Sequence, residues 1–273
     1  MLRRTILLVA ISAASTTMAA DLKPETIAAW DEYVKNLDCR APRSFASENP
    51  SDAARLRAGE IIVEPASDKM PLRVPYGLIH DWRGESFLRG ATIEEVVRVL
   101  RDYDRYKDFY RPYVLESRLI SRDPLEDRFS ALIMNKSVIA KTALRTTYRS
   151  VLHAIEPRHL YIVTDSIHIQ EVAALGTPSE HLLPEDEGTG LIWRLHSLTR
   201  LEQRDGGVYF DLEVVAMSRD IPASLRWLVS PIVRRVSRSS LAASLRQTGD
   251  AVRGDALIQA ASASSTPRAR LVR

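Results

Sequence analysis

Six histidines are the side chains of this 273-residue chain best suited to acid–base or metal chemistry. They are His80, His153, His159, His168, His181 and His196. None forms an H-x-x-x-H or H-E-x-x-H pattern, and no carboxylates join them at ligand spacing, so we expect no metal site and no bound cofactor. The chain also lacks the G-x-S-x-G turn of hydrolases and the phosphate-binding loop of P-loop proteins, which argues against both kinds of enzyme.

His80 has the best case for a catalytic role, because it falls on the apolar side of an alternating segment. Residues 77–89 alternate between apolar and charged positions, which predicts a half-buried strand with His80 and Trp82 on its inner face. There His80 could act as a general base with Tyr148 as a hydrogen-bond donor, as a cyclase would need. The alternative is a buried histidine whose hydrogen bonds are satisfied locally. His196 has the outer parity on its own strand and is expected to be exposed.

Other polar side chains share the predicted inner faces with aliphatic groups. The inward positions include His80, Trp82, Thr142, Thr146, Tyr148, Trp193, Ser197 and Thr199. A buried polar group without a partner costs on the order of 1–3 kcal/mol, so the set as a whole favours a wet or ligand-filled cavity over a dry core. The alternative is that each hydroxyl bonds its own backbone or a neighbour.

A dense aromatic run follows the first predicted helix of the main domain. It includes Tyr103, Tyr106, Phe109, Tyr110 and Tyr113. One interpretation is a cavity mouth that meets an apolar ligand or a membrane interface, where amphipathic rings are favoured. The other interpretation is a local aromatic core.

A long hairpin between residues 191 and 219 positions several of the inward side chains. The turn at Asp205-Gly206 sets its pairing, because both central residues of such a turn need positive φ. The pairs on the apolar face are Leu201 with Phe210, Thr199 with Leu212, Ser197 with Val214, Leu195 with Ala216 and Trp193 with Ser218. On the other face Arg200 meets Asp211, so we expect one covered apolar face and one charged face.

A C-terminal helix is expected to cover the apolar face. Pro231 disfavours a helical Ser230, so the sequence predicts a short helix, a break, and a second helix over roughly 231–250. The inner side of the second helix carries Val233, Val236, Ser240, Leu241, Ser244, Leu245 and Thr248. A helix that leaves room for a ligand and a helix that packs closely on a sheet both favour such small residues.

The middle of the chain predicts a helix and a series of antiparallel strands. Thr92 and Glu95 form a capping box that opens the helix. Strands are expected at 115–122, 127–136, 138–151 and 160–172. In the last of them either the odd-numbered or the even-numbered residues could face inward. The loop at 174–190 is long enough for a flap or a rim.

The two ends of the chain differ in composition from its middle. Residues 1–20 carry two arginines, an apolar run and small residues ending at Ala19 or Ala20, which is typical of a secretory signal peptide. We therefore expect a secreted or periplasmic protein with an N-terminal helical extension and linker at 21–75, a main domain at 76–253 and a disordered tail at 254–273. Much of the excess positive charge lies at the ends, so we expect no nucleic-acid partner.

The predicted order is strand, helix, about six antiparallel strands and a long terminal helix. This is an α+β helix-grip arrangement, in which a curved antiparallel sheet wraps around the C-terminal helix. The run DYDRYKDFY-RPY, from Asp102 to Tyr113, is similar to the D-x-x-x-Y-x-x-F stretch that ends the first helices of coenzyme-Q-binding and cyclase-like proteins. From about Tyr76 to Arg253 the chain resembles the SRPBCC superfamily of START-like domains. The resemblance implies a hydrophobic cavity that holds a lipid-like or polycyclic molecule.

We therefore expect an exported binding or carrier protein for a hydrophobic small molecule of the lipid or isoprenoid-quinone class. The residues expected to contact the ligand are His80, Trp82, Tyr106, Phe109, Tyr110, Thr146, Tyr148, Trp193, Ser197, Thr199, Val236, Ser240 and Ser244. The Arg-rich C-terminal helix could also touch an anionic membrane surface transiently, or simply present a solvated face. The alternatives are a polyketide cyclase or aromatase that uses the same cavity, and an interaction module that docks a protein partner.

Overall fold

The computed structural model of the protein describes residues 22–41, 49–136, 141–156, 158–221, 224 and 226–264. The expected signal peptide at residues 1–20 lies outside them, as do residues 265–273. The helices are α1 (Pro24–Asp38), α2 (Pro50–Arg57), α3 (Ile93–Leu100), the 3-10 turn η2 (Tyr103–Arg105), α4 (Tyr106–Phe109) and α5 (Arg226–Ser264). The strands are β1 (Ile62–Pro65), β2 (Leu72–Val74), β3 (Gly77–Arg89), β4 (Val114–Arg122), β5 (Glu126–Lys136), β6 (Lys141–Glu156), β7 (His159–Ala173), β8 (His181–Leu182), β9 (Arg194–Arg204) and β10 (Gly207–Arg219).

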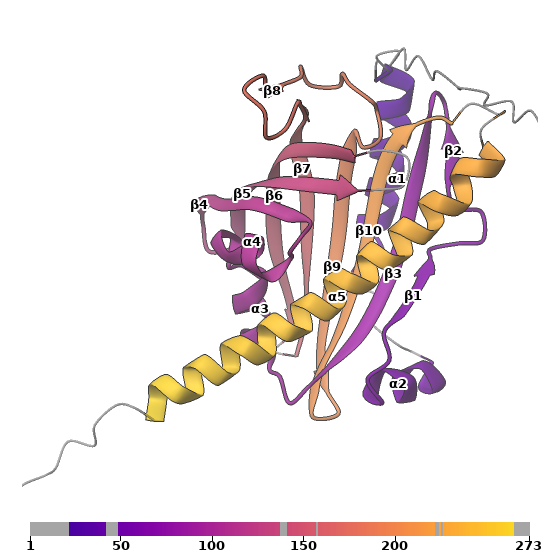
Figure 1. Ribbon diagram of the computed structural model, residues 1–273. Coiled ribbons are helices and arrows are strands. Elements are labelled where there is room, and N and C mark those ends of the chain that lie inside the picture. The colour runs from indigo at the N-terminus through magenta and orange to yellow at the C-terminus, as the bar shows by residue number, and fades with distance from the viewer. Residues whose placement is uncertain are drawn as a thin grey trace, which may run out of the picture.

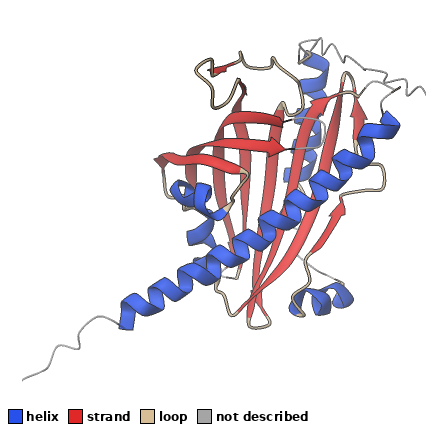
Figure 2. Cartoon of the chain, in the orientation of Figure 1, coloured by secondary structure: helices blue, strands red, loops and turns tan. Residues whose placement is uncertain are grey.

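The strands form one ten-stranded sheet in the order β1-β3-β10-β9-β7-β6-β5-β4, with β2 beside β3 and β8 beside β7. The sheet curves around α5, which crosses its inner face diagonally, while α1 lies on the other side (Figure 1). Figure 2 shows the same division, with one broad sheet between α5 in front and α1 behind. The expected α+β helix-grip arrangement is confirmed.

The main core lies between the inner face of the sheet and helices α3 and α5. It joins Trp82 of β3 and Phe210 of β10 to Val96 of α3 and to Leu241 and Leu245 of α5. The helical side chains are spaced so that each helix buries one stripe against the sheet. Burial of this stripe, rather than helix propensity alone, holds α5 across the sheet.

The hairpin of β9 and β10 has the predicted register. Asp205 and Gly206 both have positive φ, 56° and 76°, as the turn requires. Leu201 pairs with Phe210, and Arg200 pairs with Asp211. The turn therefore fixes which residues of both strands face α5.

The predicted start of α3 is also confirmed. Thr92 Oγ1 accepts a hydrogen bond from the Glu95 backbone N–H at 3.3 Å, and Glu95 Oε2 accepts one from the Thr92 N–H at 2.9 Å. Two otherwise unpaired donors are satisfied in this way at the point where the chain leaves β3.

A bulge resolves the ambiguous inner side of β7. Thr147 pairs with His168 but Tyr148 pairs with Ser166, so Ile167 is an extra residue in β7. Even-numbered residues such as Ile162 face inward before the bulge, and odd-numbered residues such as Ile169 face inward after it. Neither parity holds along the whole strand, which is why alternation alone could not decide it.

Helix α5 differs from its prediction at both ends. It runs from Arg226 to Ser264 with Pro231 inside it, so the expected break at Pro231 was wrong. The proline removes one backbone hydrogen bond, and the buried residues Leu241, Leu245 and Val252 hold the rest of the helix on the core. Residues 254–264 of the expected disordered tail are helical, and α5 projects past the sheet at that end (Figure 1).

The charged face of the sheet is covered too, because the N-terminal extension folds back over it. Helix α1 packs Trp30 and Leu37 on this face, and β1 and β2 of the expected linker pair with β3. His196, which was expected to be exposed, is 1 % exposed beneath α1. That expectation was wrong because alternation identifies which face a residue is on, but not what covers that face.

Gly84 is the point of closest approach between β3 and α5. A Cβ at Gly84 would lie 2.6 Å from Leu245 Cδ1 and 3.0 Å from Leu241 Cγ. We expect Gly84→Val to lower the free energy of unfolding by about 1–3 kcal/mol, because it overpacks this crossing. Urea denaturation would measure the change. Gly254→Val is the control, since a Cβ there meets nothing within 4 Å, and an equal loss in both variants would contradict the close crossing at Gly84.

Candidate functional site

A cavity of about 410 Å³ lies between the inner face of the sheet and α5. Its apolar and aromatic lining includes Leu100, Tyr106, Tyr110, Phe129, Ile133, Leu144, Tyr148, Ile162, Leu195, Phe210, Leu212 and Val214. Its hydroxyl and amide lining includes Ser150, Thr164, Ser197, Thr199, Ser240, Ser244, Gln247 and Thr248. An apolar wall with a few polar groups is typical of a site for a hydrophobic small molecule.

Aromatic rings form the end of the cavity beside α4. The rings of Tyr103 and Tyr148 stack on Phe129 with centroid distances of 4.1 and 4.8 Å. Tyr106 donates from its hydroxyl to the Leu100 backbone oxygen, and the Tyr110 hydroxyl is 3.0 Å from Thr248 Oγ1. Tyr103 belongs to a buried aromatic cluster, as the local-core interpretation expects, and Tyr106 and Tyr110 line the cavity. A mouth that meets a ligand or a membrane stays a prediction.

Three hydroxyl side chains cross the floor of the cavity in one row. Ser150 of β6 pairs with Thr164 of β7, and Thr164 pairs with Ser197 of β9. We call these three residues the hydroxyl row. The oxygens of Ser150 and Thr164 are 3.0 Å apart, and either can be the donor. The row gives one side of an otherwise apolar cavity the capacity to form hydrogen bonds.

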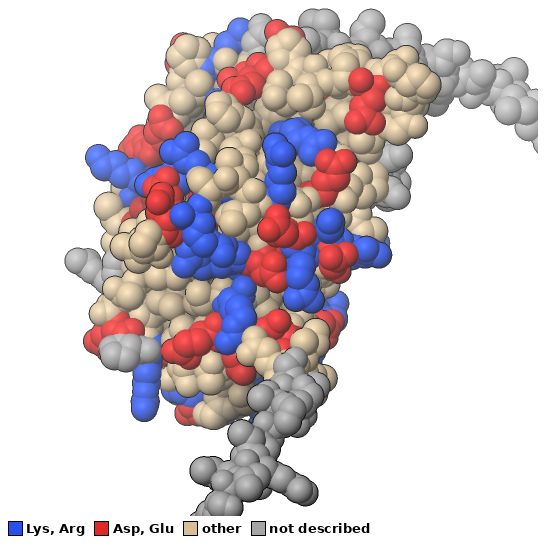
Figure 3. Space-filling view, turned by 90° about the vertical axis from the view of Figure 1, so that its left-hand side faces the viewer, with Lys and Arg blue, Asp and Glu red and all other residues tan. Residues whose placement is uncertain are grey.

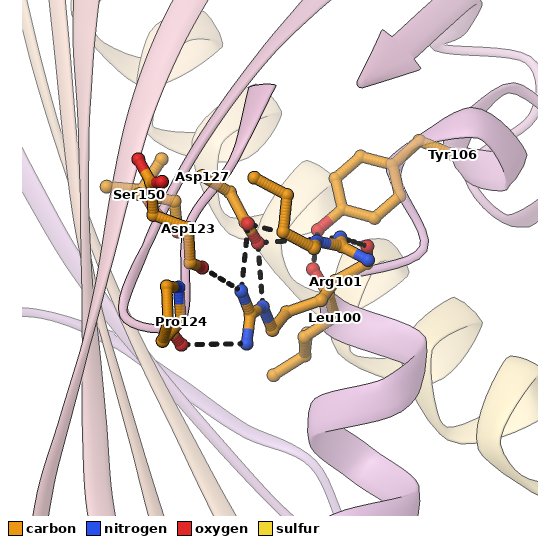
Figure 4. Close-up of polar contacts among 9 residues, drawn as sticks. Leu100, Arg101, Tyr106, Asp123, Pro124, Asp127 and Ser150 are labelled. Atoms are coloured by element: carbon orange, nitrogen blue, oxygen red, sulfur yellow. Dashed lines mark hydrogen bonds and ion pairs between the residues drawn. The ribbon is translucent and has the colours of Figure 1, made fainter. Parts of the chain in front are cut away.

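Next to the hydroxyl row, at the neighbouring strand β5, lies a buried ion pair. Asp127 of β5 pairs with Ser150, and Arg101 donates to both Asp127 carboxylate oxygens at 2.7 and 2.8 Å. Figure 4 shows the same guanidinium against the backbone oxygens of Asp123 and Pro124. Burial alone would raise the pKa of Asp127, but the hydrogen bonds from Arg101 and Arg122 outweigh it and lower that pKa. The carboxylate is therefore neutralised locally by two arginines.

The structure brings together seven of the residues expected to contact a ligand. The lining includes Tyr106, Tyr110, Tyr148, Ser197, Thr199, Ser240 and Ser244. Six others do not line the cavity: His80, Trp82, Phe109, Thr146, Trp193 and Val236. Trp82 and Phe109 instead pack in the main core, and Thr146 is fully buried in β6.

Trp193 lies on the opposite side of the sheet from its expected position. It precedes the regular pairing of β9, which begins at Arg194, and it packs with Trp30 and Leu198 in the cluster beneath α1. Its backbone N–H still donates to the Met217 oxygen at 2.7 Å. The alternation that placed Trp193 inward does not extend past the end of the strand.

His80 and Tyr148 are not brought together as a catalytic pair. His80 Nε2 is 3.0 Å from Ser218 Oγ, and Tyr148 of β6 stacks on Phe129. Strands β10, β9 and β7 separate β3 from β6 in the sheet. Burial lowers the pKa of His80 to about 4, so its imidazole is neutral at physiological pH. This geometry is that of a partly buried histidine with a local partner.

The hydroxyl row was only partly visible in the sequence. Ser150 shares the inward parity of Thr146 and Tyr148 on β6, so alternation could have found it. Thr164 lies on the strand whose inner side was ambiguous because of the bulge at Ile167. Gln247 and Thr248 of α5 also line the cavity, and Gln247 was not among the candidates.

The loop between β7 and β9 is tied to the sheet at two points. Glu171 Oε2 accepts hydrogen bonds from the Thr189 backbone N–H at 2.8 Å and from its hydroxyl at 2.9 Å. Arg194 and Asp186 form an ion pair at 2.6 Å. These contacts hold the end of the loop just before Ile192, which is part of the cavity wall.

Acidic and basic side chains are intermixed on the face formed by α3, α4 and the neighbouring strands (Figure 3). Ion pairs on this side include Arg111 with Asp108 and Arg145 with Glu116. The visible face therefore has no broad patch of one sign. Within the described part of the chain, no helix combines the length and the apolar character needed to cross a membrane.

No protein-family model and no curated protein matches the chain. Among solved structures, a STAR-related lipid transfer protein from Xanthomonas axonopodis is 16% identical, covers 70% of this chain and 98% of its own, and gives a TM-score of 0.47. The Zhui aromatase/cyclase from Streptomyces sp. R1128 is 14% identical, with 64% and 94% covered and a TM-score of 0.42. Human STARD10 is 10% identical, with 77% and 80% covered and a TM-score of 0.44. By its own strand order and its long C-terminal helix, the chain has the helix-grip fold that the sequence resemblance to the SRPBCC superfamily implied.

Proposed function

We propose that this protein is an exported binding or carrier protein for a hydrophobic small molecule of the lipid or isoprenoid-quinone class. The observation that supports the proposal is the cavity of about 410 Å³, lined mainly by aliphatic and aromatic side chains and covered by α5. Filling such a cavity removes apolar ligand surface from water, which is the main driving force for binding of this kind. The signal-like residues 1–20 support export.

A transient membrane contact through α5 belongs to the same proposal. Arg234, Arg235 and Arg238 form a basic stretch of this helix, and all three are exposed. Basic side chains near an anionic bilayer contribute about 1 kcal/mol each to binding. A carrier must collect and release its ligand at such a surface, so α5 is the element we assign to that contact.

The first experiment is native mass spectrometry of the protein purified from the exported fraction, followed by solvent extraction. We expect a stoichiometric apolar molecule that separates from the protein on denaturation. A protein that is empty as isolated, and whose melting temperature does not respond to a panel of lipids and quinones, would contradict the proposal.

Ser244→Phe is expected to block the cavity, because Ser244 lines it from α5. The added ring should occupy the volume that a ligand would fill and lower the bound fraction by about tenfold or more. Ser239→Phe is the matched control, since Ser239 is exposed on the same helix. Extraction and mass spectrometry of both variants at equal expression would measure the effect, and equal loading of the two would contradict the assigned site.

A further inference from the structure

The cavity walls offer hydrogen bonds but no free charge. Among the described residues that line the cavity, none is Asp, Glu, Lys or Arg. His196 belongs to the wall, but its two ring nitrogens lie 2.7 Å from Asp165 and 3.3 Å from Asp38, on the α1 side of the sheet. An ionised group moved from water into an apolar site is strongly disfavoured unless it is paired. The described lining supplies no free charged partner for an ionised ligand group.

The pKa values of the cavity tyrosines show that burial at this site disfavours an ionised group. Burial raises the pKa of Tyr106, Tyr110 and Tyr148 above the ordinary value for a tyrosine. The same loss of hydration would act on a carboxylate or phosphate brought to this position. A neutral hydroxyl or carbonyl carries a much smaller desolvation cost.

The hydroxyl row is placed to meet such a neutral oxygen. A hydroxyl can donate once and accept twice. Ser150 shares one bond with Thr164 and also interacts with the Tyr103 hydroxyl, so the pair keeps acceptor positions for a ligand hydroxyl. Ser197 adds a third hydroxyl from the neighbouring strand. Asp127, next in line, is already paired with Arg101 and Arg122, so it adds no unpaired negative charge.

Gln247 of α5 provides an unsatisfied polar atom in the cavity wall. Its Nε2 donates to the Arg111 backbone oxygen at 2.5 Å, whereas its Oε1 is buried with no hydrogen-bond partner among the described residues. A buried acceptor in this state costs on the order of 1–3 kcal/mol. A ligand hydroxyl within reach would satisfy it.

We propose that the cavity selects an uncharged lipid with a hydroxyl or carbonyl oxygen, which the hydroxyl row of Ser150, Thr164 and Ser197 binds. Lipids whose buried end is ionised are rejected, because His196, which can carry a positive charge in the described wall, is already paired with Asp165 and Asp38. This inference rests on the proposed carrier function and specifies the chemical class of its ligand.

Three probes that share a twelve-carbon chain but differ in their terminal group test whether the cavity prefers an uncharged oxygen. Isothermal titration and native mass spectrometry at pH 8 would compare dodecanol, dodecanoate and dodecane. We expect dodecanol to bind at least about tenfold more tightly than dodecanoate. Equal affinities for the alcohol and the carboxylate would overturn the selection and leave the carrier function standing, whereas failure of all three probes to bind would overturn both.

Thr164→Val tests the hydroxyl row, because it removes a hydroxyl at nearly constant volume. We expect it to weaken dodecanol binding by about three- to tenfold and to leave dodecane binding unchanged. Thr147→Val is the matched control, since Thr147 lies on the opposite face of β6 and outside the cavity lining. An equal effect on dodecanol and dodecane, or an equal effect of the two variants on dodecanol, would overturn the assignment of the row.

Discussion

An Arg200→Met variant is expected to lose about 3–5 kcal/mol of its free energy of unfolding. Arg200 is 2 % exposed and lies on the outer face of the sheet between two carboxylates. Its Nη1 is 3.3 Å from Asp211 Oδ2, and its Nη2 is 2.8 Å from Glu213 Oε2. Both carboxylates are buried as well. Methionine fills similar space without the charge, so Glu213 is left buried beside an apolar group.

Asp211 and Glu213 should respond differently to that substitution. Asp211 keeps Arg83, whose Nη2 is 2.5 Å from Asp211 Oδ2. Glu213 loses the guanidinium that pairs with it. The double variant Arg200→Met/Glu213→Leu should therefore recover most of the loss, because replacing both members of a buried pair by apolar groups is often nearly neutral. Urea denaturation at constant pH measures each free energy from the midpoint and the slope.

Arg145→Met is the matched control for Arg200→Met. Arg145 pairs with Glu116 at 2.6 Å, but the Glu116 side chain is 60% exposed. A surface pair of this kind contributes about 0–1 kcal/mol. If Arg200→Met cost no more than Arg145→Met, the outer face beneath α1 would be hydrated rather than buried.

The pairing of Arg200 with Asp211 follows from the sequence, whereas its burial does not. The Asp205-Gly206 turn has a local signature, and a two-residue turn determines every cross-strand pair of its hairpin. The cover is non-local, because α1 lies more than a hundred residues earlier in the chain and reaches the sheet only in the folded state. The charged face of a strand can be exposed to solvent or covered by a segment distant in the sequence. The alternation of residue types is the same in both cases, so it cannot predict which occurs.

The cavity residues could be predicted where the alternation of a strand or the period of a helix is regular. Ser197 and Thr199 on β9, and Ser240 and Ser244 on α5, were found in this way. Thr164 could not be assigned because the bulge at Ile167 reverses the facing of β7. Trp193 was misplaced because the chain turns away just before β9 begins. In both places a local irregularity of the backbone interrupts the two-residue alternation of the strand, so the sequence pattern gives the wrong face or no answer.

The stability of the protein is expected to fall by roughly 3 kcal/mol between about pH 6.5 and pH 9, through His196. Burial alone would lower the pKa of His196, but the carboxylates of Asp165 and Asp38 outweigh it and raise that pKa to about 9. The folded protein therefore holds this proton more tightly than the unfolded chain does. The stabilisation is fully present below pH 6.5 and is lost as the pH rises through about 9.

Two buried carboxyls act in the same direction at lower pH. Burial, with the charge of Glu213, raises the pKa of Asp81 to about 7, and burial raises the pKa of Glu85 to about 7. Between pH 4 and pH 7 these two carboxyls bind more protons in the folded state than in the unfolded chain, so they make stability fall with rising pH. His80, whose pKa is lowered to about 4, acts in the opposite sense and offsets part of this fall between pH 4 and pH 6.5.

His196→Gln separates the histidine from these carboxyls. The variant should keep the fall below pH 7 but show a flatter profile between pH 6.5 and 9, because glutamine does not titrate. His168→Gln serves as the control, since it removes a histidine whose side chain is 54% exposed on β7 rather than buried beneath α1. Urea midpoints at half-unit pH steps would record all three curves. A wild-type profile already flat above pH 6.5, or parallel curves for wild type and His196→Gln, would show that the His196 proton does not hold Asp38 of α1 to the sheet.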